Sequence, residues 1–271
     1  MIQSNLLHCL ILGAVCLTAP VLSAQTLPPD KARLADVVFI GEQHDNPGHH
    51  ALQAEWVQSL EPAALVFEML TPAQAQNITS EDRQVEETLS QVLEWENSGW
   101  PDFAMYFPIF AAAPEAAILG AGVPRDQVRG MMQRDVAEVF GAEDAARFGL
   151  DEPLPADQQA EREALQARAH CDALPEDLLP MMVSVQRMRD ATLARAALDA
   201  HQQTGGPVVV ITGNGHARAD WGAPHYLQQA APDLVLFALA QGEEGSMPDG
   251  LFDATVDGPK VDRGNPCDAF N

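Results

Sequence analysis

The chain has 271 residues, which is enough for one domain of good size or for a core domain with an insertion. Its 39 acidic residues outnumber its 15 basic residues, and the formal net charge is −24 at pH 7. Because no stretch is basic enough to neutralise several phosphates, we expect neither nucleic acid nor an anionic membrane surface to be a partner.

The N-terminal segment has the features of an export signal. Leu6 to Leu22 is almost wholly apolar, and Ser23-Ala24 offers small residues for cleavage, although the usual basic start is missing. We expect a signal peptide at residues 1–24, a single mature domain at residues 25–271, and a periplasmic or outer-membrane-associated protein. Lipidation at Cys16 is the alternative, and a lipid anchor would then be the route to a membrane.

The cysteines predict a disulfide bond in the exported protein. Cleavage of the signal would remove Cys9 and Cys16 and leave Cys171 and Cys267. In an oxidising compartment such a pair tends to close, and without a CxxC partner it makes a poor metal site. The bond would tie the C-terminal tail to the middle of the chain.

Apolar, β-rich runs alternate with helical patterns along the chain. The runs are continuous, as expected for strands that are buried on both faces. We therefore predict an α/β fold with a mostly parallel β-sheet flanked by helices. The strands are expected at residues 37–40, 64–67, 117–122, 208–212 and 234–239.

Two long stretches carry helical patterns without strand signals, at about residues 72–110 and 125–204. They are too long for simple crossovers, so we expect a helical subdomain inserted over one end of the sheet. The first crossover helix has a clear start, because Asn46 is a plausible N-cap and Pro47 suits the first helical position.

Polar side chains follow three of the predicted strands. His44 follows the first strand, Glu68 ends the second, and His216 follows the fourth. Because ligands of open parallel sheets bind beyond the carboxyl ends of the strands, we expect these side chains to face one cavity. They could bind a divalent metal such as manganese, cobalt or zinc, or form an acid–base pair with an orienting group.

Glu42 belongs to the same candidate catalytic set. It could accept a proton, or hold a ligating imidazole in place by a hydrogen bond. The structural alternative is that Glu42 caps a backbone turn while His44 binds a buried carbonyl. Gln186 and Asp190, one helical turn apart, could both point at this site or simply bind each other.

These residues also carry a resemblance to a known family. The run Val38-Phe39-Ile40-Gly41-Glu42-Gln43-His44-Asp45-Asn46-Pro47-Gly48-His49-His50 resembles the signature of the ChaN-like haem-binding proteins. The match spans about residues 36–227. The further motifs, in chain order, are Glu68-Met69, Gly99-Trp100-Pro101, Tyr106-Phe107-Pro108-Ile109, Gln186 with Arg189-Asp190, and Gly213-Asn214-Gly215-His216.

The resemblance implies a surface or periplasmic protein of haem uptake, with dimers able to hold haem between their subunits. More distantly, the two Gly-x-x-His elements are similar to those of the Tiki and erythromycin-esterase superfamily. That likeness implies the alternative function, a metal-dependent hydrolase or peptidase that uses His44, Glu68 and His216.

Haem binding requires an axial ligand and a flat apolar surface. Tyr106 and Tyr226 are the tyrosines of the chain, and a phenolate suits ferric iron. Aromatic residues surround Tyr106 in the sequence, so we predict Tyr106 as the axial ligand, with His49, His50 and Tyr226 as alternatives. Aromatic residues at helical spacing are also common in cores, and His49 shares a face with core residues. Arg218 completes the candidate haem-binding set.

Overall fold

The computed structural model describes residues 27–265 and 267–268, so the predicted signal peptide and Cys16 lie outside the described residues. The described chain forms one six-stranded sheet in the order β3-β2-β4-β1-β5-β6, and all pairings between its strands are parallel. This confirms the predicted α/β fold. The strands are β1 (Val37–Glu42), β2 (Ala64–Phe67), β3 (Ala117–Gly120), β4 (Val208–Gly213), β5 (Leu236–Glu243) and β6 (Ala254–Gly258).

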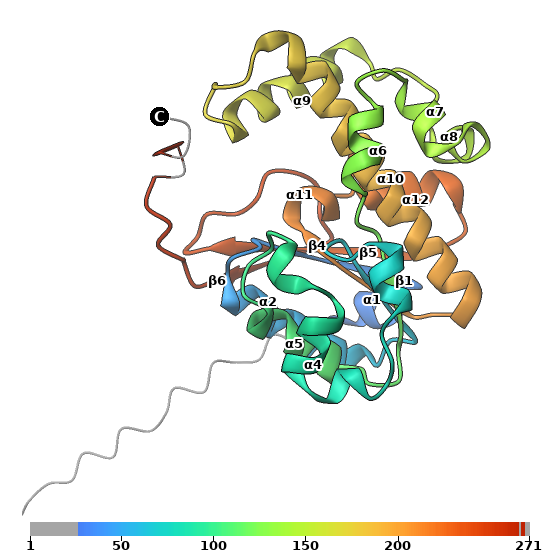
Figure 1. Ribbon diagram of the computed structural model, residues 1–271, viewed down its shortest axis with the longest axis vertical. Helices are drawn as coiled ribbons and strands as arrows, with labels where there is room; N and C mark the ends of the chain where they lie inside the picture. Colours follow the sequence, from blue (N-terminus) through green and yellow to red (C-terminus); the bar gives the residue numbers. More distant parts are fainter. Residues whose placement is uncertain (1–26, 266, 269–271) are drawn as a thin grey trace, which may run out of the picture.

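The central strands are buried on both faces, which explains their continuous apolar sequences. Successive side chains of a strand point to opposite faces. In β1, Val37 and Phe39 contribute to one core, while Val38 and Ile40 contribute to the other. The sheet is therefore the middle layer of three, with helices on both sides (Figure 1).

The two helical insertions lie on opposite faces of the sheet (Figure 1). The first insertion packs beside α2 on one face, and the second packs with α12 on the other. On the first face lie α2 (Pro47–Leu60), η1 (Asp82–Gln84), α4 (Glu86–Val92), η2 (Trp95–Asn97) and α5 (Phe103–Ala112). The short helix α3 (Pro72–Gln76) contacts the edge strand β3. The second insertion contains α6 (Arg125–Gly130), α7 (Val136–Phe140), α8 (Ala142–Phe148), α9 (Ala156–Ala169), η3 (Glu176–Leu178) and α10 (Leu179–Thr204).

The long helix α10 is the crossover that carries the second insertion back to the sheet. Small residues such as Ala191, Ala194 and Ala197 are fully buried, which lets the helix lie close to the strands. The helix ends at Gly205, whose φ of 80° is left-handed and suits glycine. The remaining helices are α1 (Asp30–Arg33), α11 (Asn214–Ala217) and α12 (Ala223–Ala230).

Several local predictions are confirmed. Asn46 caps α2 by accepting hydrogen bonds from the amides of Gly48 and His49, and Pro47 is its first residue. A disulfide joins Cys171 and Cys267. Within the described part of the chain, no helix has the length and apolar character that a membrane span requires.

Candidate functional site

The site forms where β1, β2 and β4 end, because β4 pairs with both of the other strands. The turn after β1 carries His44, and Glu68 follows β2 directly. The chain leaves β4 at Gly213 and enters the short helix α11, which carries His216. The structure thus brings together the three residues whose convergence the sequence predicted.

Glu68 lies at the centre of this group and is almost completely buried. Its Oε2 accepts hydrogen bonds from the Thr212 hydroxyl at 2.7 Å and from the Gly213 amide at 2.8 Å. Its Oε1 lies 3.6 Å from His216 Nε2 and 4.0 Å from His44 Nε2. Burial alone would raise the pKa of Glu68, but the neighbouring imidazoles and these hydrogen bonds outweigh it and lower the pKa to about 2. Glu68 is therefore a carboxylate.

His216 is held by a second carboxylate on the opposite side of its ring. Its Nδ1 lies 2.6 Å from Oδ1 of Asp190, a buried residue of α10. Burial alone would lower the pKa of His216, but the charges of Glu68 and Asp190 outweigh it and raise the pKa to about 9. His216 is therefore an imidazolium at neutral pH, placed between two acids. Sequence reasoning placed Asp190 near the site but missed this pairing.

Glu42 organises the other half of the site. Its Oε1 accepts a hydrogen bond from the Tyr106 hydroxyl at 2.9 Å and lies 2.7 Å from His44 Nδ1. Its Oε2 lies 3.3 Å from His50 Nδ1. Burial alone would lower the pKa of His44, but the Glu42 hydrogen bond and the charge of Glu68 raise it overall. Glu42 thus fixes the orientation of His44.

The structure does not support Tyr106, Tyr226, His49 or His50 as axial haem ligands. All four side chains are buried, with residue exposures between 0% and 2%. Burial and the neighbouring Glu42 raise the pKa of Tyr106 far above its ordinary value, which disfavours the phenolate form in which a tyrosine binds ferric iron. Tyr106 is instead a core residue that supports Glu42.

The other candidates have structural partners as well. His49 accepts a hydrogen bond from the Gln43 amide and contacts the Gly242 carbonyl through Nε2 at 3.0 Å. The Tyr226 hydroxyl accepts from Arg187. Arg218 donates hydrogen bonds from Nε and Nη2 to the two carboxylate oxygens of Asp220, and its guanidinium group stacks on Trp221. The charge of Arg218 is therefore already balanced within the protein.

The metal prediction is not supported either. Among residues 27–265 and 267–268, no group of three or more His, Cys, Asp and Glu side chains is arranged as a metal-ligand set. His44, Glu68 and His216 do lie together, with His216 Nε2 at 3.6 Å and His44 Nε2 at 4.0 Å from Glu68 Oε1.

A cavity of about 360 Å³ opens beside Glu68. Met69, Trp100, Val123 and Leu193 give it apolar surface, while Arg125 and Arg189 supply positive charge. The ring of His44 contacts Trp100 edge-on, with 4.8 Å between ring centroids. The side chain of His44 is 32% exposed, so its ring is accessible from outside.

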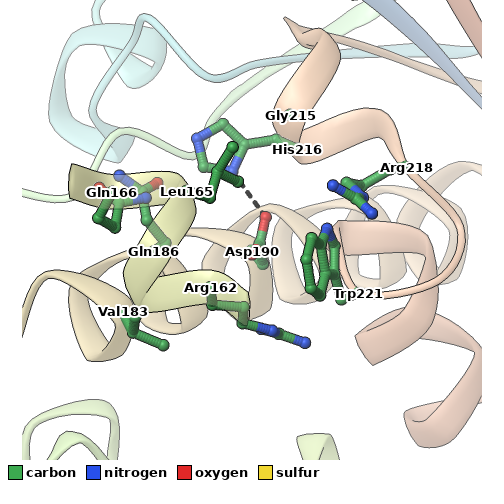
Figure 2. A pocket seen from close by; sticks show the side chains of 10 residues that line it. All are labelled: Arg162, Leu165, Gln166, Val183, Gln186, Asp190, Gly215, His216, Arg218 and Trp221. Atoms are coloured by element: carbon green, nitrogen blue, oxygen red, sulfur yellow. Dashed lines mark hydrogen bonds and ion pairs between the residues drawn. The ribbon is translucent and has the colours of Figure 1, made fainter. Parts of the chain in front are cut away.

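A second, smaller cavity of about 110 Å³ lies on the far side of His216 (Figure 2). It is enclosed by α9, α10 and the chain that follows α11. The two cavities are separated by the ion pairs of His216 with Glu68 and Asp190.

The fold and the position of the site define an α/β protein with a polar ligand site at the carboxyl ends of its parallel strands. A family model described as haem-binding uptake, Tiki superfamily, ChaN matches residues 29–227. The chain therefore belongs to this haem-binding family, in agreement with the resemblance seen in the sequence. No curated protein matches the sequence significantly.

Two solved structures are similar to this chain, and the first of them shows the same fold. One is described as cofacial haem binding to ChaN of Campylobacter jejuni; it is 18% identical, with a TM-score of 0.58, and the match covers 78% of this chain and 83% of that one. Another is the type III effector HopBA1, which is 14% identical with a TM-score of 0.47 and coverages of 85% and 90%.

Proposed function

We propose that this protein is an exported haem carrier that acts in haem or iron uptake, and that His44 is its axial iron ligand. The observation that carries the proposal is the accessible imidazole of His44, which is fixed by a carboxylate and contacts Trp100 in the wall of an apolar and basic cavity. Membership of the haem-binding family and the Campylobacter jejuni structure with cofacial haem support it.

The surroundings of His44 suit an iron ligand. With Nδ1 bound to Glu42, Nε2 is the nitrogen left for iron, and a carboxylate partner increases the basicity of a ligating imidazole. The residues predicted from the sequence as axial ligands lack such access because they are buried.

The walls of the larger cavity suit the rest of a haem. Trp100 and Val123 offer apolar surface for the macrocycle. Arg125 and Arg189 line the same cavity, and neither has a carboxylate partner within 4.0 Å in the described part of the chain. Guanidinium groups bind carboxylates through two parallel hydrogen bonds, so these arginines are suited to haem propionates.

The size of the cavity also bears on oligomeric state. At about 360 Å³ it lies at the lower end of the range for small-molecule sites, so a haem would extend beyond it. We therefore include in the proposal a homodimer in which a second protomer covers the exposed part of the haem. Sedimentation of the protein with and without hemin tests the homodimer. We expect dimers in the sample loaded with hemin.

Titration of the purified protein with hemin tests the function itself. We expect a saturable shift of the Soret band, and affinity about tenfold weaker when Arg125→Gln and Arg189→Gln are combined, because each arginine contributes a charge-assisted hydrogen bond. Arg129→Gln is the matched control, since Arg129 is exposed on α6 outside the cavity. A Soret band that matches free hemin at every ratio would overturn the proposal.

A metal-dependent hydrolase or peptidase is the second candidate. One observation favours it: two imidazoles direct Nε2 toward the same oxygen of Glu68, and each has its Nδ1 beside another carboxylate. Carboxylate–imidazole pairs of this kind support metal ligands in many enzymes. Elemental analysis of protein never exposed to chelators tests it, and stoichiometric manganese, cobalt or zinc that is lost in His216→Ala would favour this function.

A further inference from the structure

The small cavity beyond His216 contains a buried positive charge that no carboxylate of the described chain contacts. Arg162 on α9 is 7% exposed and lines this cavity. Its Nη2 donates to the amide oxygen of Gln158 at 3.2 Å, while its Nε is buried without any hydrogen-bond partner. No carboxylate lies within 4.0 Å of Arg162 in the described part of the chain.

The position of Arg162 is fixed by an aromatic ring. Its guanidinium carbon lies 4.7 Å from the ring centroid of Trp221, and that of Arg218 lies 3.7 Å from the same ring. In Figure 2 the indole of Trp221 lies between these two guanidinium groups. The cation is therefore held in place at the cavity by stacking, although its hydrogen-bonding capacity is largely unused.

The other charges of the cavity are already paired. Arg218 binds Asp220, and Asp190 binds His216, as the dashed line in Figure 2 marks. The remaining polar groups of the wall are neutral amides, Gln166 and Gln186. Among the charged groups of this wall, Arg162 is the one that no oppositely charged group contacts.

We propose that this cavity is a binding site for a carboxylate group, held by the guanidinium of Arg162. A buried charge without a partner is costly, and a bound carboxylate would supply the missing acceptors in the fork geometry that arginine prefers. Asp190 lines the same cavity and would repel a phosphate more strongly than a carboxylate group, because a phosphate concentrates more negative charge on one group. The volume of about 110 Å³ admits a short organic acid or the end of a longer one. The site lies apart from the larger cavity beside His44, so it does not depend on the haem proposal.

Tryptophan fluorescence tests this proposal, because Trp221 contacts Arg162. Titration of the whole mature protein with succinate at constant ionic strength should change the emission saturably, and Trp221→Phe should remove the change. In Arg162→Gln we expect affinity at least about tenfold weaker, and Arg162→Lys should also bind more weakly because it keeps the charge but loses the fork. Arg168→Gln, an exposed position on the same helix, should behave like the wild type.

Two further arms make the result decisive. The first uses calorimetric titration with succinate, applied only to variants whose circular dichroism spectrum matches that of the wild type. It separates a variant that no longer binds from one that no longer folds. Hemin titration of Arg162→Gln identifies the source of the carboxylate: a weaker affinity indicates a haem propionate, and an unchanged affinity indicates a free organic acid. The absence of a saturable response in the wild type, equal affinity in Arg162→Gln, or phosphate binding more tightly than succinate would each overturn the proposal.

Discussion

At the scale of single residues, Glu42 connects three side chains of the site. One buried carboxylate contacts Tyr106, His44 and His50, and it therefore couples the hydrophobic core to the accessible imidazole. The sequence pointed to Glu42 and His44 because both follow an apolar strand. The role of Tyr106 could not be inferred, since aromatic residues at helical spacing fit a core and a haem-facing wall equally well.

Removal of the Tyr106 hydroxyl should affect stability but not haem binding. Tyr106→Phe deletes a buried hydrogen bond to a carboxylate, for which we expect a loss of about 1–3 kcal/mol in the free energy of unfolding. Urea denaturation measures the loss, and hemin titration of the folded variant should give the wild-type Soret band. An unchanged free energy of unfolding would contradict the hydrogen bond.

The ion pairs of His216 predict a pH dependence of stability. The raised pKa of His216, from 6.5 to about 9, means that its contribution is complete below pH 6.5 and is lost as the pH rises through 9. The lowered pKa of Glu68, from 4.5 to about 2, gives a contribution that is complete above pH 4.5 and is lost as the pH falls toward 2. The stabilisation should therefore be greatest between pH 4.5 and 6.5.

Comparison of the wild type with His216→Gln measures this stabilisation. The variant leaves two buried carboxylates without their cation, so we expect it to unfold more easily by about 3–5 kcal/mol near pH 6. Urea denaturation at pH values from 4 to 10 should show the difference shrinking at the alkaline end. A difference that stays constant across this range would show that the ion pairs do not titrate as described.

At the scale of secondary structure, the apolar runs predicted the strands well because the sheet is buried on both faces. The exception is β6, an edge strand whose side chains alternate between half-buried and exposed, and whose sequence therefore lacks a continuous apolar run. The pairing of Asp190 with His216 could not be predicted from the sequence either. Their 26-residue separation spans the end of α10 and all of β4, and only the packing of α10 on the sheet brings them together.

Substitution should have opposite effects at two glycines of the site, Gly41 in β1 and Gly215 in α11. A Cβ atom at Gly41 would lie 2.5 Å from Asn214 Oδ1 and 2.9 Å from the Leu239 carbonyl, so Gly41→Ala should destabilise the protein by about 1–3 kcal/mol. A Cβ atom at Gly215 would meet nothing within 4 Å, so Gly215→Ala is the matched control and should be neutral or slightly stabilising. Thermal unfolding of both variants checks the prediction, and equal melting temperatures would contradict it.

At the scale of the whole molecule, the sheet separates two helical layers, and the site lies at the strand ends between them. The disulfide connects the region after α9 to the C-terminal tail, across 96 residues of sequence. Such a bond is expected of a protein that folds in an oxidising compartment. The predicted signal peptide would send this protein to such a compartment.

Loss of the disulfide should therefore weaken the mature protein. In Cys171→Ala combined with Cys267→Ala, the unfolded chain is released from a long covalent loop, and we expect a loss of about 2–4 kcal/mol in unfolding free energy. Urea denaturation of the oxidised wild type and the double variant measures it. Free thiols in protein isolated from the periplasm would contradict the bond.

The identity of the axial ligand is the most direct test of the account. Resonance Raman and absorption spectra of the ferric haem complex should be compared for the wild type, His44→Ala and Tyr106→Phe. We predict a histidine-ligated spectrum in the wild type and in Tyr106→Phe, and its loss in His44→Ala. A phenolate spectrum that disappears in Tyr106→Phe and persists in His44→Ala would contradict the account.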